Sequence, residues 1–115
     1  MTPDQSGRAR KTVLVQGPPE LQAYLDSPGG VETKAQVRRT IRVLRENPAA
    51  GEHVRRDLWP DRYARLRINN LFRCRVGGQT RIAYTIVDTD PDTRVVRILD
   101  LFRTHKEYER VFGYG

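Results

Sequence analysis

The stretch that decides the fold is residues 71–84, which read LFRCRVGGQTRIAY. Up to the Gly-Gly pair, arginine and apolar side chains alternate along the chain. This period of two is typical of a β-strand with one buried and one open face, and a Gly-Gly pair between two strand-like runs indicates a hairpin turn. We therefore predict two antiparallel strands with an apolar face and an arginine face, the latter carrying Arg73, Arg75 and Arg81.

The same alternation continues upstream of this stretch. Arg65 and Arg67 share the parity of the hairpin arginines, and the residues of the other parity are Ala64, Leu66 and Ile68. The pattern predicts one long strand over residues 64–76, or two strands in line with a bulge at 69–70. Six arginines and no Asp or Glu occur from residue 62 to residue 81, so this face would carry charge of one sign.

Helical spacing, β-branched runs and turn residues predict the other elements. Strands are expected at 12–16, 81–87 and 94–102, and helices at 20–27, at 31–47 and after Thr104, which forms a capping-box pattern with Glu107. The order β-α-α-β-β-β-α predicts an α+β fold: an antiparallel-dominated four-stranded sheet, a helical hairpin on one face and a short C-terminal helix. The first strand would lie at an edge of this sheet and the last in its interior. Residues 1–11 are expected to be a flexible basic N-terminus, and residues 12–115 a single domain.

Composition favours an anionic partner. The chain has 115 residues, with 21 Lys and Arg against 14 Asp and Glu, a net charge of +7. Most of the excess is arginine, which binds phosphate and carboxylate groups through two parallel hydrogen bonds. Nucleic acid, an acidic protein or an anionic surface would all suit such a charge.

Several other kinds of site are not expected. The one cysteine, Cys74, lies on the apolar parity of its strand, so we expect it in the core rather than as a nucleophile. The two histidines have no ligand-like spacing and no phosphate-binding loop is present, so no metal and no cofactor are predicted. No leader-like or long apolar segment occurs, and we expect a cytoplasmic protein without membrane contact.

Two groups of residues are candidates for a functional site. The first is the arginine face, which could be a solvated surface. However, like charges on neighbouring strands repel one another, and this favours an anionic partner. The second group follows the last predicted strand and consists of Arg103, His105, Lys106 and Tyr108. These residues could simply form the outer turn of a surface helix, but histidine exchanges protons near neutral pH and could serve acid–base chemistry.

With these residues in view, the chain resembles the RelE/ParE superfamily of toxins from type II toxin–antitoxin systems. The resemblance covers about residues 12–112 in element order. It is most specific in LFRCRVGGQTRIAYTIV, a basic strand followed by a Gly-containing turn and a strand with Arg and an aromatic residue. It is supported by RVVRILDLFRTHKEYERVFG, a last strand that ends in Arg and is followed by a Tyr.

The resemblance implies an activity and a set of residues. RelE-like members cleave mRNA in the ribosomal A site without a metal: the ribose 2′-OH attacks the neighbouring phosphate and leaves a 2′,3′-cyclic phosphate. By position, Arg81, Arg103 and Tyr108 match family site residues, and some relatives use a C-terminal histidine, here His105. These four residues are the expected catalytic set. The expected RNA-binding residues are Arg65, Arg67, Arg73, Arg75 and Lys106. The implied partners are the ribosome with its mRNA and a cognate antitoxin.

Two alternatives remain open within this resemblance. RelE has lysines where this chain has Arg73 and Arg75, and arginine is a poor general base because it stays protonated. Proton transfer would therefore pass to His105 or Tyr108, or the chain would not be a nuclease. In the second case it would act as a ParE-like inhibitor of DNA gyrase, or as an inactive member of an autoregulatory complex, since fold alone does not separate these branches.

Overall fold

The computed structural model describes residues 11–113 of the chain. Most of the N-terminal stretch that we expected to be flexible, residues 1–10, lies outside the described residues. The helices are α1 (Pro19–Asp26), α2 (Val31–Glu46), α3 (Asp61–Ala64) and α4 (His105–Phe112), with short 3-10 turns at Pro48–Ala50 and Arg56–Leu58. The strands are β1 (Thr12–Gln16), β2 (Glu52–His53), β3 (Phe72–Gly77), β4 (Thr80–Asp90) and β5 (Thr93–Phe102). The two long predicted helices and the capped C-terminal helix are thus confirmed.

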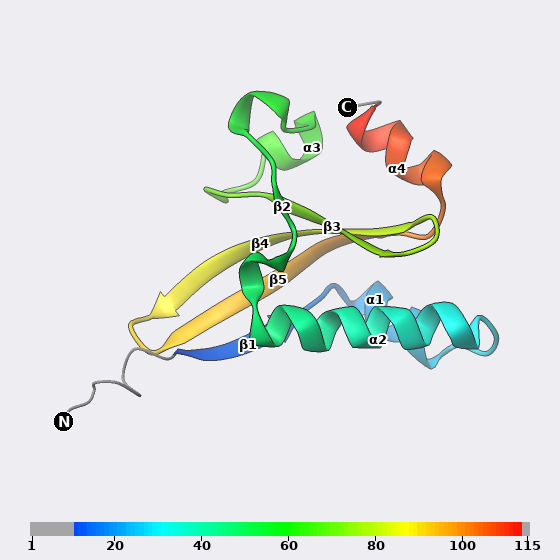
Figure 1. Ribbon diagram of the computed structural model, residues 1–115. Coiled ribbons are helices and arrows are strands. Elements are labelled where there is room, and N and C mark those ends of the chain that lie inside the picture. The colour runs from blue at the N-terminus through cyan, green and yellow to red at the C-terminus, as the bar shows by residue number, and fades with distance from the viewer. Residues whose placement is uncertain (1–10, 114–115) are drawn as a thin grey trace.

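The strands form one five-stranded mixed sheet with the order β1-β5-β4-β3-β2 (Figure 1). β3, β4 and β5 make the predicted antiparallel meander, and β1 joins β5 in parallel at one edge. β5 lies in the interior, between β1 and β4, as expected. The prediction of four strands was wrong by one, because the two-residue strand β2 pairs with β3 at the far edge. Two residues are too few to show a period in the sequence.

Each face of the sheet carries its own apolar core. On one face, α1 and α2 pack over the sheet through a cluster that includes Leu21, Val37 and Ile82. On the other face, α3 and α4 contribute Tyr63 and Tyr108 to a second cluster, centred on side chains such as Leu71, Ala83 and Phe102. Figure 1 shows α3 and α4 on the opposite side of the sheet from α2. The second face is therefore only partly open, whereas we had expected it to carry arginines alone.

The prediction of a strand over residues 64–71 was wrong. Pro60 precedes the short helix α3, and the chain then bends until it enters β3. The anchor of this segment is Tyr63, which is 1% exposed and donates a hydrogen bond from its hydroxyl to Asp100 Oδ2 (2.6 Å). Leu66, on the parity predicted to face the core, is instead 44% exposed. Arg65 and Arg67 are consequently exposed side chains of a bend and do not extend the arginine face.

The side chain of Asn70 takes the place of strand pairing at the start of the hairpin. Its Oδ1 accepts the backbone N–H of Ile86 (2.8 Å), and its Nδ2 donates to the carbonyl of the same residue (2.8 Å). Thr85, which is 2% exposed, donates its hydroxyl proton to the Asn70 carbonyl (2.7 Å). The bonds to Ile86 give backbone groups of β4 their hydrogen-bond partners at the point where β3 no longer lies beside β4.

Helix α4 begins with a side-chain cap. Thr104 Oγ1 accepts the N–H of Glu107 (3.1 Å), as the capping-box pattern predicts. The Glu107 carboxylate reaches back one residue further than the pattern implies and accepts the N–H of Arg103 (3.1 Å). Both bonds fix the turn between β5 and α4, which lies beside the hairpin. Among residues 11–113, no helix is long and apolar enough to span a membrane.

Candidate functional site

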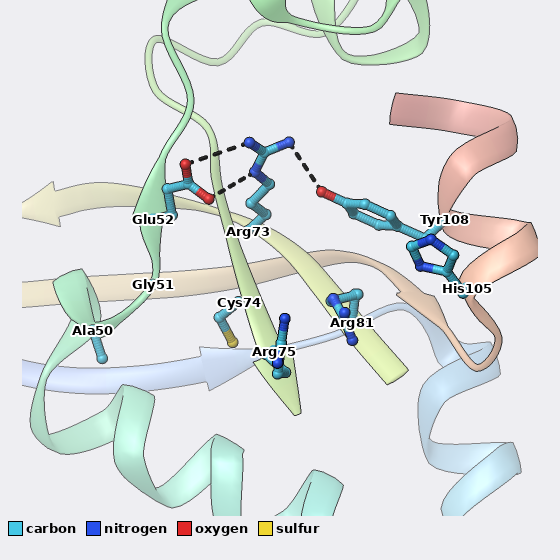
Figure 2. A pocket seen from close by; sticks show the side chains of 9 residues that line it. All are labelled: Ala50, Gly51, Glu52, Arg73, Cys74, Arg75, Arg81, His105 and Tyr108. Carbon is cyan, nitrogen blue, oxygen red and sulfur yellow. Dashed lines mark hydrogen bonds and ion pairs between the residues drawn. The ribbon is translucent and has the colours of Figure 1, made fainter. Parts of the chain in front are cut away.

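A pocket of about 520 Å³ lies where the β3–β4 hairpin, β2 and α4 meet (Figure 2). Strand β2 and the turn before it form one wall, the hairpin the floor, and α4 the opposite wall. Its lining residues are Ala50, Gly51, Glu52, Arg73, Cys74, Arg75, Arg81, His105 and Tyr108. Five of these residues were predicted as catalytic or RNA-binding, so the fold gathers residues that are far apart in the sequence.

Strand register puts the three hairpin arginines on one face. Arg75 lies directly opposite Arg81, and Arg73 lies opposite Ala83, which belongs to the core on the α4 side. The intervening residues Phe72 and Cys74 pack toward the helical hairpin. The predicted division of this hairpin into an apolar face and an arginine face is confirmed.

Arg73 is held between an acid and a tyrosine. Its guanidinium donates to both carboxylate oxygens of Glu52, at 3.0 and 3.4 Å, and to the hydroxyl of Tyr108 (2.9 Å). The hydrogen bond and the charge of Arg73 lower the pKa of Glu52, and the hydrogen bond that Arg73 donates to Glu52 is the main cause that raises the pKa of Arg73. The result is a fixed row of three polar groups across the pocket, from β2 to α4 (Figure 2).

Glu52 is the site residue that the sequence reasoning missed. Its strand is two residues long, and only its register opposite Arg73 brings it into the pocket. Gly51 makes this approach possible: a Cβ on it would lie 2.7 Å from the Tyr84 hydroxyl and 2.8 Å from the Arg73 carbonyl. The Tyr84 hydroxyl also accepts the Gly51 N–H (2.9 Å) and donates to the Pro48 carbonyl (2.7 Å), so it ties this turn to the sheet. The only signal for this site residue in the sequence is the pair Gly51-Glu52, which follows the turn residues Asn47-Pro48, and it is a weak one.

Arg75 and Arg81 have no carboxylate partner among the residues that the structure describes. Arg81 donates to the carbonyls of Gly78 (3.0 Å) and Thr80 (3.2 Å), and its guanidinium carbon lies 5.8 Å from the Tyr108 ring centroid. The Arg75 side chain is exposed. Two facing cations without an anion repel one another, so an anion placed between them would relieve this repulsion.

Tyr108 and His105 come from the first turn of α4. Tyr108 is 9% exposed and stacks on Phe112, and its hydroxyl reaches the pocket. His105 stands at the pocket rim with a side chain that is 52% exposed, and its Nε2 lies 2.8 Å from a carboxylate oxygen of Glu109. The Glu109 carboxylate in this position fixes the direction of the ring. His105 is thereby placed to exchange a proton with a group bound in the pocket.

The other predicted site residues lie elsewhere. Phe102 faces the α4 side, so the next residue, Arg103, turns to the opposite face and stacks on Tyr24 of α1 at 5.2 Å. There it borders a separate hollow of about 760 Å³ between α1 and β5. Lys106 is exposed on α4 and does not line the pocket, and Arg65 and Arg67 belong to the bend described above.

Cys74 does not supply a nucleophile to the site. Burial raises the pKa of its thiol to about 11, so almost no thiolate exists at neutral pH. Its side chain packs with the core under α1 and α2, as predicted. In residues 11–113, no group of three His, Cys, Asp or Glu side chains is arranged to hold a metal ion.

The pocket thus combines anion binding with groups that move protons. Arg75 and Arg81 supply positive charge that no carboxylate within residues 11–113 neutralises. Arg73 orients a tyrosine hydroxyl, and an imidazole and a carboxylate stand on opposite walls. Such a set can bind a phosphodiester and stabilise negative charge that develops on its oxygens. In comparisons with known proteins, no family model, no curated protein and no solved structure matches this chain.

Proposed function

We propose that this protein is the toxin of a type II toxin–antitoxin system, a RelE-like endoribonuclease that cleaves mRNA on the ribosome. The observation that carries the proposal is the pocket itself. Three arginines, a tyrosine hydroxyl and an imidazole converge there, and two of the arginines have no carboxylate partner among the described residues. The order of the main elements also agrees with a RelE-like topology, with β2 and α3 as short additions.

The chemistry would be a metal-independent transesterification. The 2′-oxygen attacks the adjacent phosphorus while its proton passes to a base; the bond to the 5′-oxygen breaks, and that oxygen takes up a proton. The products are a 2′,3′-cyclic phosphate and a 5′-hydroxyl end. Arg75 and Arg81 would hold the non-bridging oxygens, whose charge grows in the transition state.

The site offers defined groups for the two proton transfers. His105 lines the pocket with an imidazole that can serve as a general acid or base, and its contact with Glu109 fixes the direction of the ring. Glu52 is a second group in the pocket with oxygens that could accept a proton, although Arg73 lowers its pKa and so makes it a weaker base than a free carboxylate. The hydroxyl of Tyr108 already accepts a bond from Arg73, which leaves its own proton available to a substrate oxygen. Arg103, on the opposite face, would take no part in these steps.

The charge of the chain suits the proposed partners. A net charge of +7 would favour binding to rRNA and mRNA phosphates, with an affinity that falls steeply as salt rises. A cognate antitoxin would cover the pocket arginines with acidic residues and thereby exclude the RNA. With these partners the protein would act in the cytoplasm.

The test is a reconstituted cleavage assay with purified ribosomes carrying a defined mRNA. We expect the wild-type chain to cut within the A-site codon and leave a 2′,3′-cyclic phosphate, and His105→Ala to slow the cut by about 10²–10⁴-fold. Arg42→Ala is the matched control, since Arg42 is exposed on α2, on the other face of the sheet. Intact mRNA in this assay, together with gyrase-dependent DNA breaks in cells that express the chain, would overturn the proposal in favour of a ParE-like function.

A further inference from the structure

The two edges of the sheet differ in how they are protected. At the β2 edge the strand has two residues, Glu52 and His53, and is too short and polar to recruit another strand. At the β1 edge, Thr12–Gln16 (TVLVQ) is a five-residue strand without a charge, proline or bulge. Within residues 11–113, β1 pairs with β5 on one side and with no strand on the other. Open edges of this kind are templates for pairing with another chain.

The backbone of β1 presents its free groups in a defined order. Thr12 donates its N–H to the carbonyl of Asp92 (2.8 Å) and so points toward the β5 side. Because successive residues of a strand direct their N–H and C=O groups to opposite sides, Val13 and Val15 point outward. The open edge therefore offers two donors and two acceptors, all of them on valines.

We propose that two copies of this chain associate by antiparallel pairing of their β1 strands, with the two-fold axis at Leu14. The sequence Val-Leu-Val is symmetric about this residue, so Val13 of one copy falls opposite Val15 of the other. Such a pair exchanges both of its hydrogen bonds, and the symmetry makes two such pairs. In each valine pair, the two N–H and two C=O groups that point outward then have hydrogen-bond partners. No other antiparallel register of β1 with itself gives partners to all of them.

The side chains agree with this register. Val13 and Val15 already pack against the core under α1 and α2, whereas Leu14, on the opposite face, is 45% exposed. Leu14 lies beside Val95, and Val95 lies beside Val87, which is 36% exposed. Pairing would place the two Leu14 side chains in contact and double this apolar strip across the joined sheets. Lys11, the residue before β1, donates a hydrogen bond from its amine to the Pro91 carbonyl (2.6 Å) in the β4–β5 turn.

The arrangement leaves the candidate site free. The pocket lies on β2, β3 and β4, at the other end of the strand order from β1. In the ten-stranded sheet, seven strand spacings of about 4.8 Å would separate the two β3 strands by about 34 Å. The dimer would thus present two separate, outward pockets, and this inference stands whether or not the pockets cleave RNA. A contact of one short strand per copy is small, so the association should be weak and dependent on concentration.

Disulfide trapping tests the register. In a Cys74→Ala background, Leu14→Cys would place the two Cα atoms about 4.5 Å apart, within the range that a disulfide bridges. Thr12→Cys is the matched control, because Thr12 falls opposite Gln16 of the other copy and the two Thr12 Cα atoms would lie about 14 Å apart. With oxidised glutathione as the oxidant, we expect Leu14→Cys to form a covalent dimer at least about tenfold faster than the control. Equal rates would overturn the proposed register.

Sedimentation of the wild-type chain tests the association itself. We expect a monomer–dimer equilibrium that shifts toward the dimer as concentration rises, and Leu14→Lys should weaken it about tenfold or more by placing two charges at the axis. Because Leu14 faces solvent in the monomer, this variant should keep the wild-type circular dichroism spectrum. A wild-type chain that remains monomeric up to millimolar concentration would overturn the proposal.

Discussion

Residues 64–68 and residues 72–76 carry the same alternation of arginine and apolar side chains, yet only the second segment forms a strand. The difference lies in what flanks them. Strand β3 leads into a Gly-Gly turn that folds β4 back along it, whereas the upstream segment begins after Pro60 and ends at Asn70, which bonds to β4 by its side chain. Alternation therefore predicts which way side chains face only where a neighbouring strand is available to pair.

The largest effect on stability should come from the anchor of the upstream segment. Tyr63→Ala removes a side chain that is 1% exposed, and we expect the free energy of unfolding to fall by about 3–5 kcal/mol. Arg65→Ala, two residues away and exposed, should change it by less than about 0.5 kcal/mol. Urea unfolding curves of the two variants would check this contrast. Similar losses in both would mean that the segment pairs as a strand after all.

The next effect concerns the junction between the two segments. Asn70→Ala leaves the N–H and C=O of Ile86 without their side-chain partners, and we expect a loss of about 1–3 kcal/mol. Its neighbour Asn69 is exposed and accepts one hydrogen bond from Asn70 Nδ2 (2.8 Å). Asn69→Ala removes only this exposed bond and serves as the control, with an expected loss below about 0.5 kcal/mol. Thermal unfolding monitored by circular dichroism would separate them; equal melting temperatures would argue against Asn70 as the end of the pairing.

Much of the fold follows from local pattern, as these two segments show. The hairpin, the helix α2 and the Thr104 cap are each specified within a few residues, by alternation, by helical spacing and by a capping side chain. The helix α3 and the strand β2 are short, and their positions depend on distant partners, Asp100 for Tyr63 and Arg73 for Glu52. Such partners are not visible in a local pattern.

The residues of the candidate site, like the elements of the fold, could be predicted where a local pattern specifies them. Arg73, Arg75 and Arg81 follow from strand parity, and Tyr108 and His105 from helical spacing after the cap. Arg103 was expected with them because it ends the last strand. The residue before it faces α4, however, so the alternation of the strand sends Arg103 to the other side, against Tyr24.

A third prediction tests the face assigned to the hairpin's apolar residues. The pKa of the Cys74 thiol is raised to about 11 by burial, so alkylation by iodoacetamide at pH 7 should be far slower in the folded chain than in urea. Between pH 7 and pH 10 the rate should rise about tenfold per unit, because only the thiolate reacts. Equal rates for the folded and unfolded chains at pH 7 would place Cys74 on the open face.

The smallest effect concerns Glu52 and its bond to Arg73. Folding lowers the pKa of the Glu52 carboxyl, so its ionised form stabilises the folded state at any pH above its pKa in the unfolded chain, near 4.5. This contribution is lost as the pH falls through the lower pKa of the folded state. Glu52→Gln should therefore lower stability at pH 7, by less than about 1 kcal/mol since the pair is partly exposed, and should have no effect at strongly acidic pH. Urea unfolding at both pH values checks this, and a penalty that persists in acid would contradict the assigned pair.

The measurement that tests the central claim compares the arginines of the two segments in the ribosomal cleavage assay. One double variant, Arg75→Ala/Arg81→Ala, removes the two pocket guanidiniums that have no carboxylate partner in the described part of the chain. The other, Arg65→Ala/Arg67→Ala, removes the same net charge from the bend. We expect the first double variant to lose cleavage by about 10²-fold or more, and the second to stay within a few-fold of the wild type. Equal losses would show that only overall charge matters, and a larger loss from the bend would contradict the assignment of the pocket as the RNA-cleaving site.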